Sequence, residues 1–254
     1  MAKIIAVANQ KGGIGKTTTA IALSTGFARK GFKTLLIDAD PQSNASDTFK
    51  ADVENSLTLQ DVFEGVPIKE AIQKTEIGDI VPGDLRLSNA DRLYSNSPKG
   101  FYILKEALTP VLKSYKYIII DTPPSLGVMT LNALTAADSL IIPVFAERFS
   151  LKGIAQLSET INETKKYSNP NLTIDGILLT CYDGRTILAR TLKNTLQEFS
   201  QMLNTKLFDT KIRRSVAMGE SQNEQESIFN YAPSSTTALD YDAFIIEYLE
   251  GMKK

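Results

Sequence analysis

The 254-residue sequence contains no histidine and only one cysteine, Cys181. The missing histidine excludes a histidine general base, a His-containing catalytic triad and a His-ligated zinc site. A lone cysteine forms no intrachain disulfide and supplies no cysteine metal cluster, which suits the reducing cytosol. No apolar run approaches the roughly 20 residues of a membrane-spanning helix, and the sequence opens directly on a strand pattern. We therefore expect a cytoplasmic protein without a membrane span.

Composition is otherwise ordinary, with 43% hydrophobic and 22% charged residues. Such a chain is long enough for one large α/β domain with a substantial core. The net charge of −1 gives no global indication of nucleic acid, but the charges are unevenly distributed. Residues 148–214 contain eleven basic and six acidic residues, whereas residues 215–254 contain two and seven. The basic region is thus the first place to look for contacts to phosphates.

A glycine-rich segment near the N-terminus carries the clearest chemical signal. The apolar run Ile4–Ala8 predicts a buried strand, NQKGGIGKTTT follows it, and a helical pattern comes next. Strand, glycine turn and helix are the context of a phosphate-binding loop, because backbone N–H groups and the helix dipole favour an anion there. Lys16 would contact the β- and γ-phosphates, and the Thr17 hydroxyl would bind Mg²⁺. The alternative is a plain glycine turn with a chance lysine.

Two further segments place carboxylates after predicted strands. Asp38 and Asp40 follow the strand 34–37, and Asp121 ends the strand 117–121, written YIIID. Open α/β sheets bind ligands at the carboxyl ends of their strands, so these carboxylates are expected beside the glycine loop. YIIID is typical of a Walker B strand. Taken alone, Asp38 and Asp40 are equally compatible with a solvated turn.

Strands and helices alternate along the whole chain, which predicts a doubly wound, mostly parallel sheet with helices on both faces. We expect one α/β domain over residues 1–254. The predicted strands are 4–8, 34–37, 77–81, 117–121, 139–144 and 172–180. The predicted helices are 17–30, 58–64, 68–74, 101–115, 128–137, 149–167, 187–203 and 236–252, with a short polar switch-like segment at 43–50. The last helix is expected to pack through Leu239, Phe244, Ile245 and Leu249.

The loop departs from the usual phosphate-binding pattern, whose first glycine would fall on Gln10, and instead begins with Lys11. KGGIGKTT resembles the deviant Walker A motif of the ParA/MinD superfamily of P-loop ATPases. DTPPSLG, LLTCYDGRT, IRRSVAMGESQ and IFNYAPSS narrow the resemblance to the small ParA/Soj partition ATPases. The resemblance extends over nearly the whole chain and implies a slow ATPase that uses ATP and Mg²⁺.

The resemblance also implies roles for individual residues. Lys11, Lys16 and Asp40 would be catalytic: Lys11 would reach the ATP of a partner subunit, and Asp40 would orient or deprotonate the attacking water. Asp38 would orient the lysines or the loop. The implied metal contacts are Thr17, Asp40 and Asp121. The implied nucleotide contacts are Lys11, Gly12, Gly13, Ile14, Gly15, Lys16, Thr17, Thr18, Asp38, Asp40, Asp121 and Pro123.

Relatives in this family bind nonspecific double-stranded DNA as ATP-bound homodimers, and a ParB-like centromere-binding partner stimulates their hydrolysis. The family's DNA-contacting arginine falls on Arg185, but its second such position is Ala217. Arg213, where relatives have proline, and Arg214 could substitute for the missing contact. The predicted phosphate-binding patch comprises Arg185, Arg190, Lys193, Arg213 and Arg214. An ordinary solvated charged face remains the alternative.

Other classes of function fit less well. Only Met1 and Ala2 precede the first strand, so no N-terminal helix-turn-helix domain is expected. A MinD-like membrane switch needs a basic amphipathic C-terminal helix, and the acidic tail is a poor match. An iron-protein relative needs two cluster cysteines per chain. A bacterial tyrosine kinase needs a tyrosine-rich tail. The partner, the cargo and the choice between dimer and filament on DNA remain open.

Overall fold

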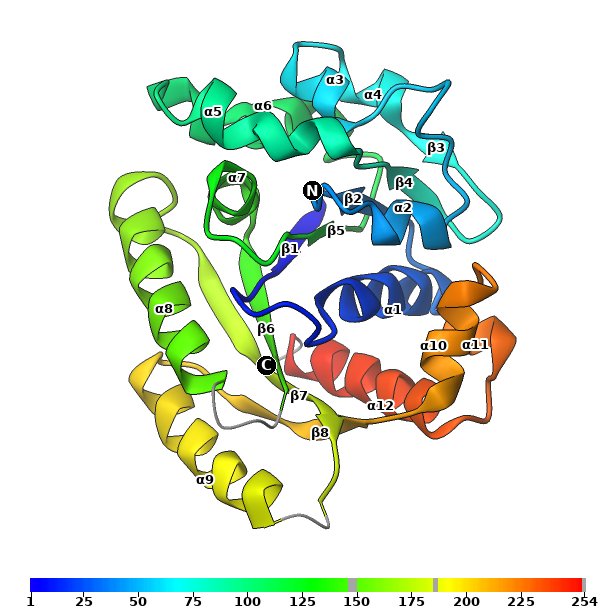
Figure 1. Cartoon of the computed structure of the whole chain (residues 1–254), viewed down its shortest axis with the longest axis vertical. Coiled ribbons are helices and arrows are strands. Elements are labelled where there is room, and N and C mark those ends of the chain that lie inside the picture. The colour runs from blue at the N-terminus through cyan, green and yellow to red at the C-terminus, as the bar shows by residue number, and fades with distance from the viewer. Residues whose placement is uncertain (146–149, 185–186, 253–254) are drawn as a thin grey trace.

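The computed structural model describes residues 1–145, 150–184 and 187–252, and an eight-stranded sheet forms its centre (Figure 1). The order across the sheet is β3-β4-β2-β5-β1-β6-β7-β8. All neighbouring pairs are parallel except β3 and β4, which confirms the prediction of a mostly parallel sheet. The strands are β1 (Lys3–Val7), β2 (Thr34–Asp38), β3 (Gln73–Lys74), β4 (Asp79–Val81), β5 (Tyr117–Asp121), β6 (Ser139–Phe145), β7 (Thr173–Tyr182) and β8 (Leu207–Arg213).

The central strands are apolar throughout because both faces of the sheet are covered. In β1, Ile4 and Ala6 belong to one hydrophobic cluster, whereas Ile5 and Val7 belong to the other. The same alternation occurs in β5, whose five residues are all buried. Successive side chains of a strand point to opposite faces, so a doubly covered strand contains no polar alternation.

Helices cover both faces. Helices α1, α11 and α12 contribute to the cluster on one face, and α3, α4, α6, α7, α8 and α9 contribute to the cluster on the other. The longer helices are α1 (Lys16–Arg29), α7 (Val128–Ala136), α8 (Ser150–Tyr167), α9 (Ile187–Met202), α10 (Val216–Asn223) and α12 (Thr236–Gly251). The shorter ones are α2 (Asn44–Thr48), α3 (Leu59–Phe63), α4 (Ile68–Ala71), α5 (Ala90–Tyr94), α6 (Ile103–Leu108) and α11 (Ile228–Tyr231). Three 3₁₀ turns are η1 (Leu85–Asn89), η2 (Pro98–Phe101) and η3 (Thr109–Val111).

Helix α1 lies against α12, and a glycine allows the close approach (Figure 1). A Cβ atom built on Gly26 would stand 2.1 Å from the Ile245 Cδ1 atom. Helix α1 then ends through Gly31, whose φ of +87° suits a residue without a side chain. The Gly31 and Phe32 amides donate to the Ala28 and Phe27 carbonyls, which completes the helix terminus.

The prediction of one helix over residues 101–115 is wrong. The structure divides this segment into η2, α6 and η3. Pro110 lacks an N–H group and cannot continue the α-helical hydrogen bonds, so the chain tightens into a 3₁₀ turn there. The helix predicted over 68–74 is also partly wrong, because α4 ends at Ala71 and residues 73–74 form β3. The other expected helices occur with boundaries shifted by a few residues, and the polar segment 43–50 contains α2.

Helix α12 packs mainly as expected, with one exception. Phe244 and Ile245 are fully buried, together with Tyr241 and Tyr248, but Leu239 is 55% exposed and does not pack against the core. Burial of this apolar side against β8 and α1 leaves little of it for a lipid surface, which weighs against the membrane-switch alternative. No helix within the described residues combines the length and apolarity needed to span a bilayer.

The edge strand β8 was not predicted from the sequence. Among the described residues it pairs with β7 alone, and α12 packs against it. The Asp209 and Thr210 amides each donate to a Glu247 carboxylate oxygen at 2.8 Å. These consecutive amides lie where the pairing of β8 with β7 shifts register, between the Leu207 and Lys211 pairings, and a side chain of α12 satisfies them there.

Candidate nucleotide site

The register of the central strands brings the motif ends together. Asp121 at the end of β5 is paired with Val7 of β1 on one side and Asp38 of β2 on the other. The glycine loop follows β1 directly, so both carboxylates lie beneath it. This is the carboxyl edge of a parallel sheet, where the fold leaves its ligand-binding crevice.

The loop has the backbone conformation that phosphate binding requires. Gly13 and Gly15 have φ angles of +68° and +85°, in the left-handed region that residues with side chains disfavour. Between them, the Ile14 side chain is buried, and its carbonyl accepts a hydrogen bond from the Thr180 hydroxyl at 2.7 Å. Helix α1 begins immediately afterwards at Lys16, so its free N–H groups face the loop.

Lys16 is buried at the amino end of α1, where its ammonium donates to the Lys11 carbonyl at 2.9 Å. Burial lowers the pKa of Lys16, and the nearby carboxylates of Asp121 and Asp40 act in the opposite direction. The ammonium thus bonds to its own loop in a position between the glycines and the carboxylates. An anionic ligand bound there would stabilise the charged form of Lys16, which burial disfavours.

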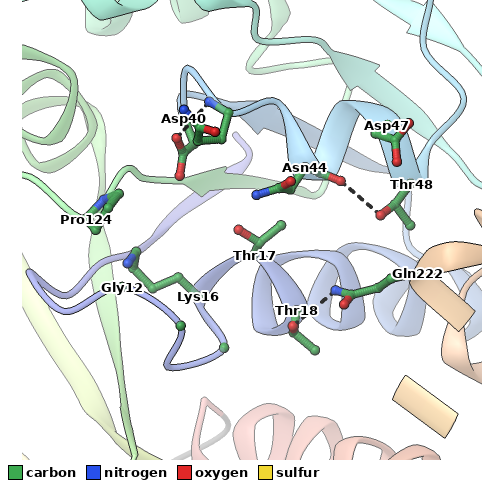
Figure 2. A pocket seen from close by; sticks show the side chains of 13 residues that line it. Gly12, Lys16, Thr17, Thr18, Asp40, Asn44, Asp47, Thr48, Pro124 and Gln222 are labelled. Carbon is green, nitrogen blue, oxygen red and sulfur yellow. Dashed lines mark hydrogen bonds between the residues drawn. The ribbon is translucent and has the colours of Figure 1, made fainter. Parts of the chain in front are cut away.

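A cleft of about 440 Å³ opens above these residues (Figure 2). The glycine loop and the start of α1 form one side, and the loop after β2 with α2 forms the other. Figure 2 shows Lys16 and Thr17 between these two sides, with Pro124 beyond Gly12. The lining residues are Gly12, Gly13, Gly15, Lys16, Thr17, Thr18, Asp40, Gln42, Asn44, Asp47, Thr48, Pro124 and Gln222.

Asp38 lies under the cleft, not in its wall. One carboxylate oxygen accepts from the Ser46 amide and hydroxyl at 2.8 and 2.6 Å, and the other accepts from the Asp40 amide at 3.2 Å. Burial raises the pKa of Asp38 to about 6, against the effect of these hydrogen bonds. Asp38 therefore orients α2 and the backbone that presents Asp40, and its expected role toward the lysines or the glycine loop stays a prediction.

Asp121 is fully buried, and neither of its carboxylate oxygens meets hydrogen-bond geometry with a described residue. Burial and the adjacent Asp38 raise the pKa of Asp121 well above its usual range, although Thr17 and Lys16 lie near enough to lower it. Unsatisfied buried carboxylate oxygens call for a cation or for water. The donor set fits Mg²⁺, which prefers oxygen ligands and keeps several waters and phosphates in its shell.

The protein alone offers no complete metal cage. Among the described residues, no group of three acidic, histidine or cysteine side chains is arranged to hold an ion. This suits a magnesium ion that enters with its nucleotide, because phosphate oxygens then supply the remaining ligands.

Five of the predicted nucleotide contacts do not line the cleft wall: Lys11, Ile14, Asp38, Asp121 and Pro123. Pro123 lines a separate small cavity, and its neighbour Pro124 lines the cleft instead. The Lys11 ammonium lies 5.8 Å from the centre of the Phe145 ring, at the end of β6. The predicted residues Gly12, Gly13, Gly15, Lys16, Thr17, Thr18 and Asp40 are all brought together.

Comparison with known proteins agrees with this geometry. The profile of the AAA domain family matches residues 2–174. The sporulation initiation inhibitor protein Soj of Bacillus subtilis is 39% identical over 246 residues, covering 95% of this chain and 96% of Soj. The chromosome partitioning protein ParA of Caulobacter vibrioides is 38% identical, covering 90% and 87%. The chain belongs to the Soj/ParA family of P-loop ATPases.

A solved structure has the same fold as this Soj/ParA chain. It is described as cobyrinic acid a,c-diamide synthase from Mycobacterium smegmatis with bound ATP analogue and magnesium. The TM-score is 0.86 at 30% identity, with 100% of this chain and 97% of that chain covered. That fold therefore accommodates the two ligands that the donor set of the cleft fits.

Sequence reasoning missed part of the cleft of this Soj/ParA protein. The Gln222 amide of α10 donates to the Thr18 hydroxyl at 3.2 Å, and the Gln225 amide donates to Asp47 of α2 at 2.9 Å. Gln222 thus joins α10 to Thr18 (Figure 2), and Gln225, just after the end of α10, joins the chain to α2. Single polar residues in a polar helix produce no spacing signal, so only the three-dimensional arrangement identifies them.

The structure describes the basic residues proposed for the DNA surface of this Soj/ParA protein to different extents. Arg185 lies outside the described residues, and Arg190 and Lys193 are placed only as positions on α9. The Arg213 guanidinium pairs with Asp240 of α12 at 2.7 Å, whereas Arg214 is exposed and no ion pair joins it to the described part of the chain.

The position of the family's second DNA contact also differs. Ala217 is partly buried against the hydrophobic cluster that includes α1 and α12. Its methyl group therefore serves packing. Of the two arginines suggested as replacements, the exposed Arg214 is better suited than Arg213, whose charge is already paired.

Proposed function

We propose that this protein is a DNA-segregation ATPase, in which ATP controls attachment to nonspecific double-stranded DNA. One observation carries the proposal: a chain 39% identical to Soj over 95% of its length retains the two-lysine loop beside Asp40 and Asp121. The names of the relatives describe chromosome partitioning, and this chain would serve a plasmid, a chromosome or an integrated element.

The glycine loop and the start of α1 bind the phosphates. The N–H groups of the loop and the Lys16 ammonium hold the β- and γ-phosphates, and Lys16 exchanges the Lys11 carbonyl for phosphate oxygen. Thr17 and Asp121 would hold Mg²⁺, with Asp40 contributing through the same site. When bound, the ion neutralises charge on the β- and γ-oxygens.

Hydrolysis requires an aimed water more than covalent chemistry. Asp40 lines the cleft opposite the glycine loop, a position that supports its role in orienting or deprotonating that water. Lys11 would leave the Phe145 ring and contact the triphosphate of a partner subunit in an ATP-dependent homodimer. Because completion of the site depends on this dimer, we expect slow turnover in the isolated protein.

DNA binding would follow dimer formation. Arg185, Arg190, Lys193 and Arg214 form the proposed phosphate-contacting set, with Arg213 in a supporting role through its pair with Asp240. Contacts to phosphates alone give binding that is independent of sequence and sensitive to salt. A ParB-like centromere-binding partner would stimulate hydrolysis and release. The protein would then work in the cytoplasm, associated with the nucleoid.

The decisive experiment measures DNA affinity in the presence of Mg²⁺ with a non-hydrolysable ATP analogue and, separately, with ADP. We expect tight binding only with the analogue. Lys16→Ala should lose both nucleotide and DNA, whereas Arg185→Ala should bind nucleotide normally and lose DNA. Lys113→Ala is the matched control, because this exposed lysine lies just before β5 at the amino edge of the sheet.

Three outcomes would contradict the proposal. A wild-type protein that binds DNA equally with ADP, or ignores DNA altogether, is not a nucleotide-controlled attachment factor. Rapid hydrolysis that neither DNA nor a partner changes would exclude the switch. Unchanged DNA affinity in Arg185→Ala would move the DNA surface elsewhere without affecting the ATPase assignment.

A further inference from the structure

The amino end of α7 is held by a residue from another helix. The Val128 amide, first in α7, donates to the Asp91 carboxylate of α5 at 2.6 Å. The N-cap position is Gly127, which has no side chain to satisfy the free N–H groups of the first turn. Asp91 supplies both the missing acceptor and a negative charge at the positive end of the helix.

The same contact explains why glycine occupies position 127. Its φ and ψ angles of −81° and −165° are open to any residue, so the backbone does not require glycine. A Cβ atom on Gly127 would instead stand 2.5 Å from both carboxylate oxygens of Asp91. The carboxylate occupies the space of a side chain, and the two residues form one unit.

This unit lies at the end of the loop that connects Asp121 to α7. At the start of the loop, the Thr122 hydroxyl donates to the Val7 carbonyl at 2.9 Å. In the middle, Pro124 lines the nucleotide cleft, and its Cβ atom is 3.8 Å from the position that a Cβ on Gly12 would take. Figure 2 shows Pro124 across from Gly12 and Lys16. The position of α7 therefore sets one side of the cleft.

Packing does not hold this loop on the side of α5. A cavity of about 90 Å³ lies between them, lined by Pro41, Asp91, Pro123 and Ser125 among others. Where side chains leave such a space, the loop depends on its hydrogen bonds for a fixed position. The Asp91–Val128 bond joins the end of this loop, at the start of α7, to α5.

We infer that Asp91 is a positioning residue for ATP: by fixing the amino end of α7, it holds Pro124 against the phosphate-binding loop. The inference rests on the proposed nucleotide site. Asp91 itself touches no nucleotide atom in this account. It acts on the phosphates through the loop 122–127, so its loss changes the affinity for ATP and the rate of ATP turnover.

The test compares Asp91→Ala with Asp91→Asn, whose amide oxygen still accepts from the Val128 amide. The measurements are the Kd of a fluorescent ATP analogue with Mg²⁺ and the steady-state kcat and KM. A displaced cleft wall should weaken analogue binding and lower kcat/KM about tenfold in Asp91→Ala. Asp91→Asn should restore most of both.

Gly127→Ala provides an independent route to the same change, because its new methyl group displaces the carboxylate. Alone, it should match Asp91→Ala. In the Asp91→Ala background it should have little further effect, since the clash is gone. Asp79→Ala is the control: Asp79 accepts from the Tyr115 hydroxyl at 2.8 Å at the start of β4, so its loss costs stability away from the cleft.

Nucleotide affinity and kcat/KM within twofold of wild type in Asp91→Ala and Gly127→Ala would overturn the inference, whatever their melting temperatures. Additive effects in the double variant would do the same. Failure of the proposed function would look different: the wild-type protein would bind no nucleotide, and Lys16→Ala would change nothing.

Discussion

The charged side chains of this protein differ sharply in how firmly they are held. Arg213 is half exposed yet bonds Asp240 through two guanidinium nitrogens, and the Asp240 carboxylate also accepts from the Arg213 amide. The adjacent Arg214 is exposed. Neighbouring arginines thus offer a matched pair in which one acts in the fold and the other faces solvent.

Arg213→Ala should lower the free energy of unfolding by about 1 kcal/mol, because Asp240 is largely buried and loses its charged partner. Arg214→Ala should leave stability unchanged within about 0.5 kcal/mol. Urea denaturation distinguishes the two. In DNA titrations over a range of salt, Arg214→Ala should reduce the salt slope by about 1. Equal stability losses would show that the ion pair contributes nothing.

Asp38 makes the stability of the nucleotide-free protein depend on pH. Burial raises its pKa to about 6 in the folded chain, above the ordinary value of 3.8 expected when unfolded. The folded state then binds more protons than the unfolded state between these values, so stability falls as pH rises through the window. The contribution lost is at most about 3 kcal/mol.

The measurement is thermal unfolding from about pH 4 to pH 7 for wild type and Asp38→Asn, which keeps the shape and removes the titration. Asp38 also raises the pKa of Asp121, so the difference between the two curves reports Asp38 together with its effect on Asp121, whereas carboxylates away from this pair affect both proteins alike. Wild type should lose stability relative to the variant as pH rises. A constant difference would show that Asp38 has an ordinary pKa.

At the scale of elements, the contact between α1 and α12 depends on a missing methyl group. Gly26→Ala improves helix propensity by about 1 kcal/mol but places Cβ 2.1 Å from the fully buried Ile245. We expect a net loss of roughly 1–2 kcal/mol from overpacking. Ile245→Val removes the clashing Cδ1 atom and should recover part of that loss in the double variant.

Gly219→Ala in α10 is the control for this prediction. A Cβ there meets nothing within 4 Å, so only the propensity gain of roughly 0.5–1 kcal/mol should appear. Chemical denaturation measures both. If Gly26→Ala stabilises the protein as much as Gly219→Ala does, α12 is not held as closely against α1 as the distances state.

The elements also show what local sequence predicts. β1, β2 and β5 were expected because doubly buried strands are apolar runs, and the glycine loop because its chemistry needs a fixed residue order. β8 was missed because Asp209, Lys211 and Arg213 interrupt its apolar residues at a sheet edge. Pro110 ended a helix that apolar spacing predicted to continue.

The long-range contacts of the site could not be predicted from sequence patterns. Asp91 and Gly127 are 36 positions apart, and nothing in the spacing joins a carboxylate to a glycine. Gln222 meets Thr18 only because α10 folds back over α1. Sequence position did not show which of Pro123 and Pro124 lines the cleft, because the loop conformation places Pro124 there and Pro123 in a separate cavity.

At the scale of the whole molecule, we predict an ATP-dependent change of mass. With Mg²⁺ and a non-hydrolysable analogue, the 27.9 kDa chain should double its mass in sedimentation or light scattering, and Asp40→Ala should do so with ATP itself. Lys11→Ala should bind nucleotide and stay monomeric, because its ammonium no longer bridges to the partner's triphosphate. Lys113→Ala should behave as wild type. A monomeric wild type would refute the ATP-dependent homodimer.

The bonding of Glu247 to β8 limits how such assemblies grow. A bare edge of this sheet would invite a strand from a neighbouring molecule, and chains crowded along DNA would be the first to form such cross-molecular sheets. With the Asp209 and Thr210 amides already occupied, that route is blocked at this stretch. Contacts between molecules at this stretch would then have to use side-chain surfaces.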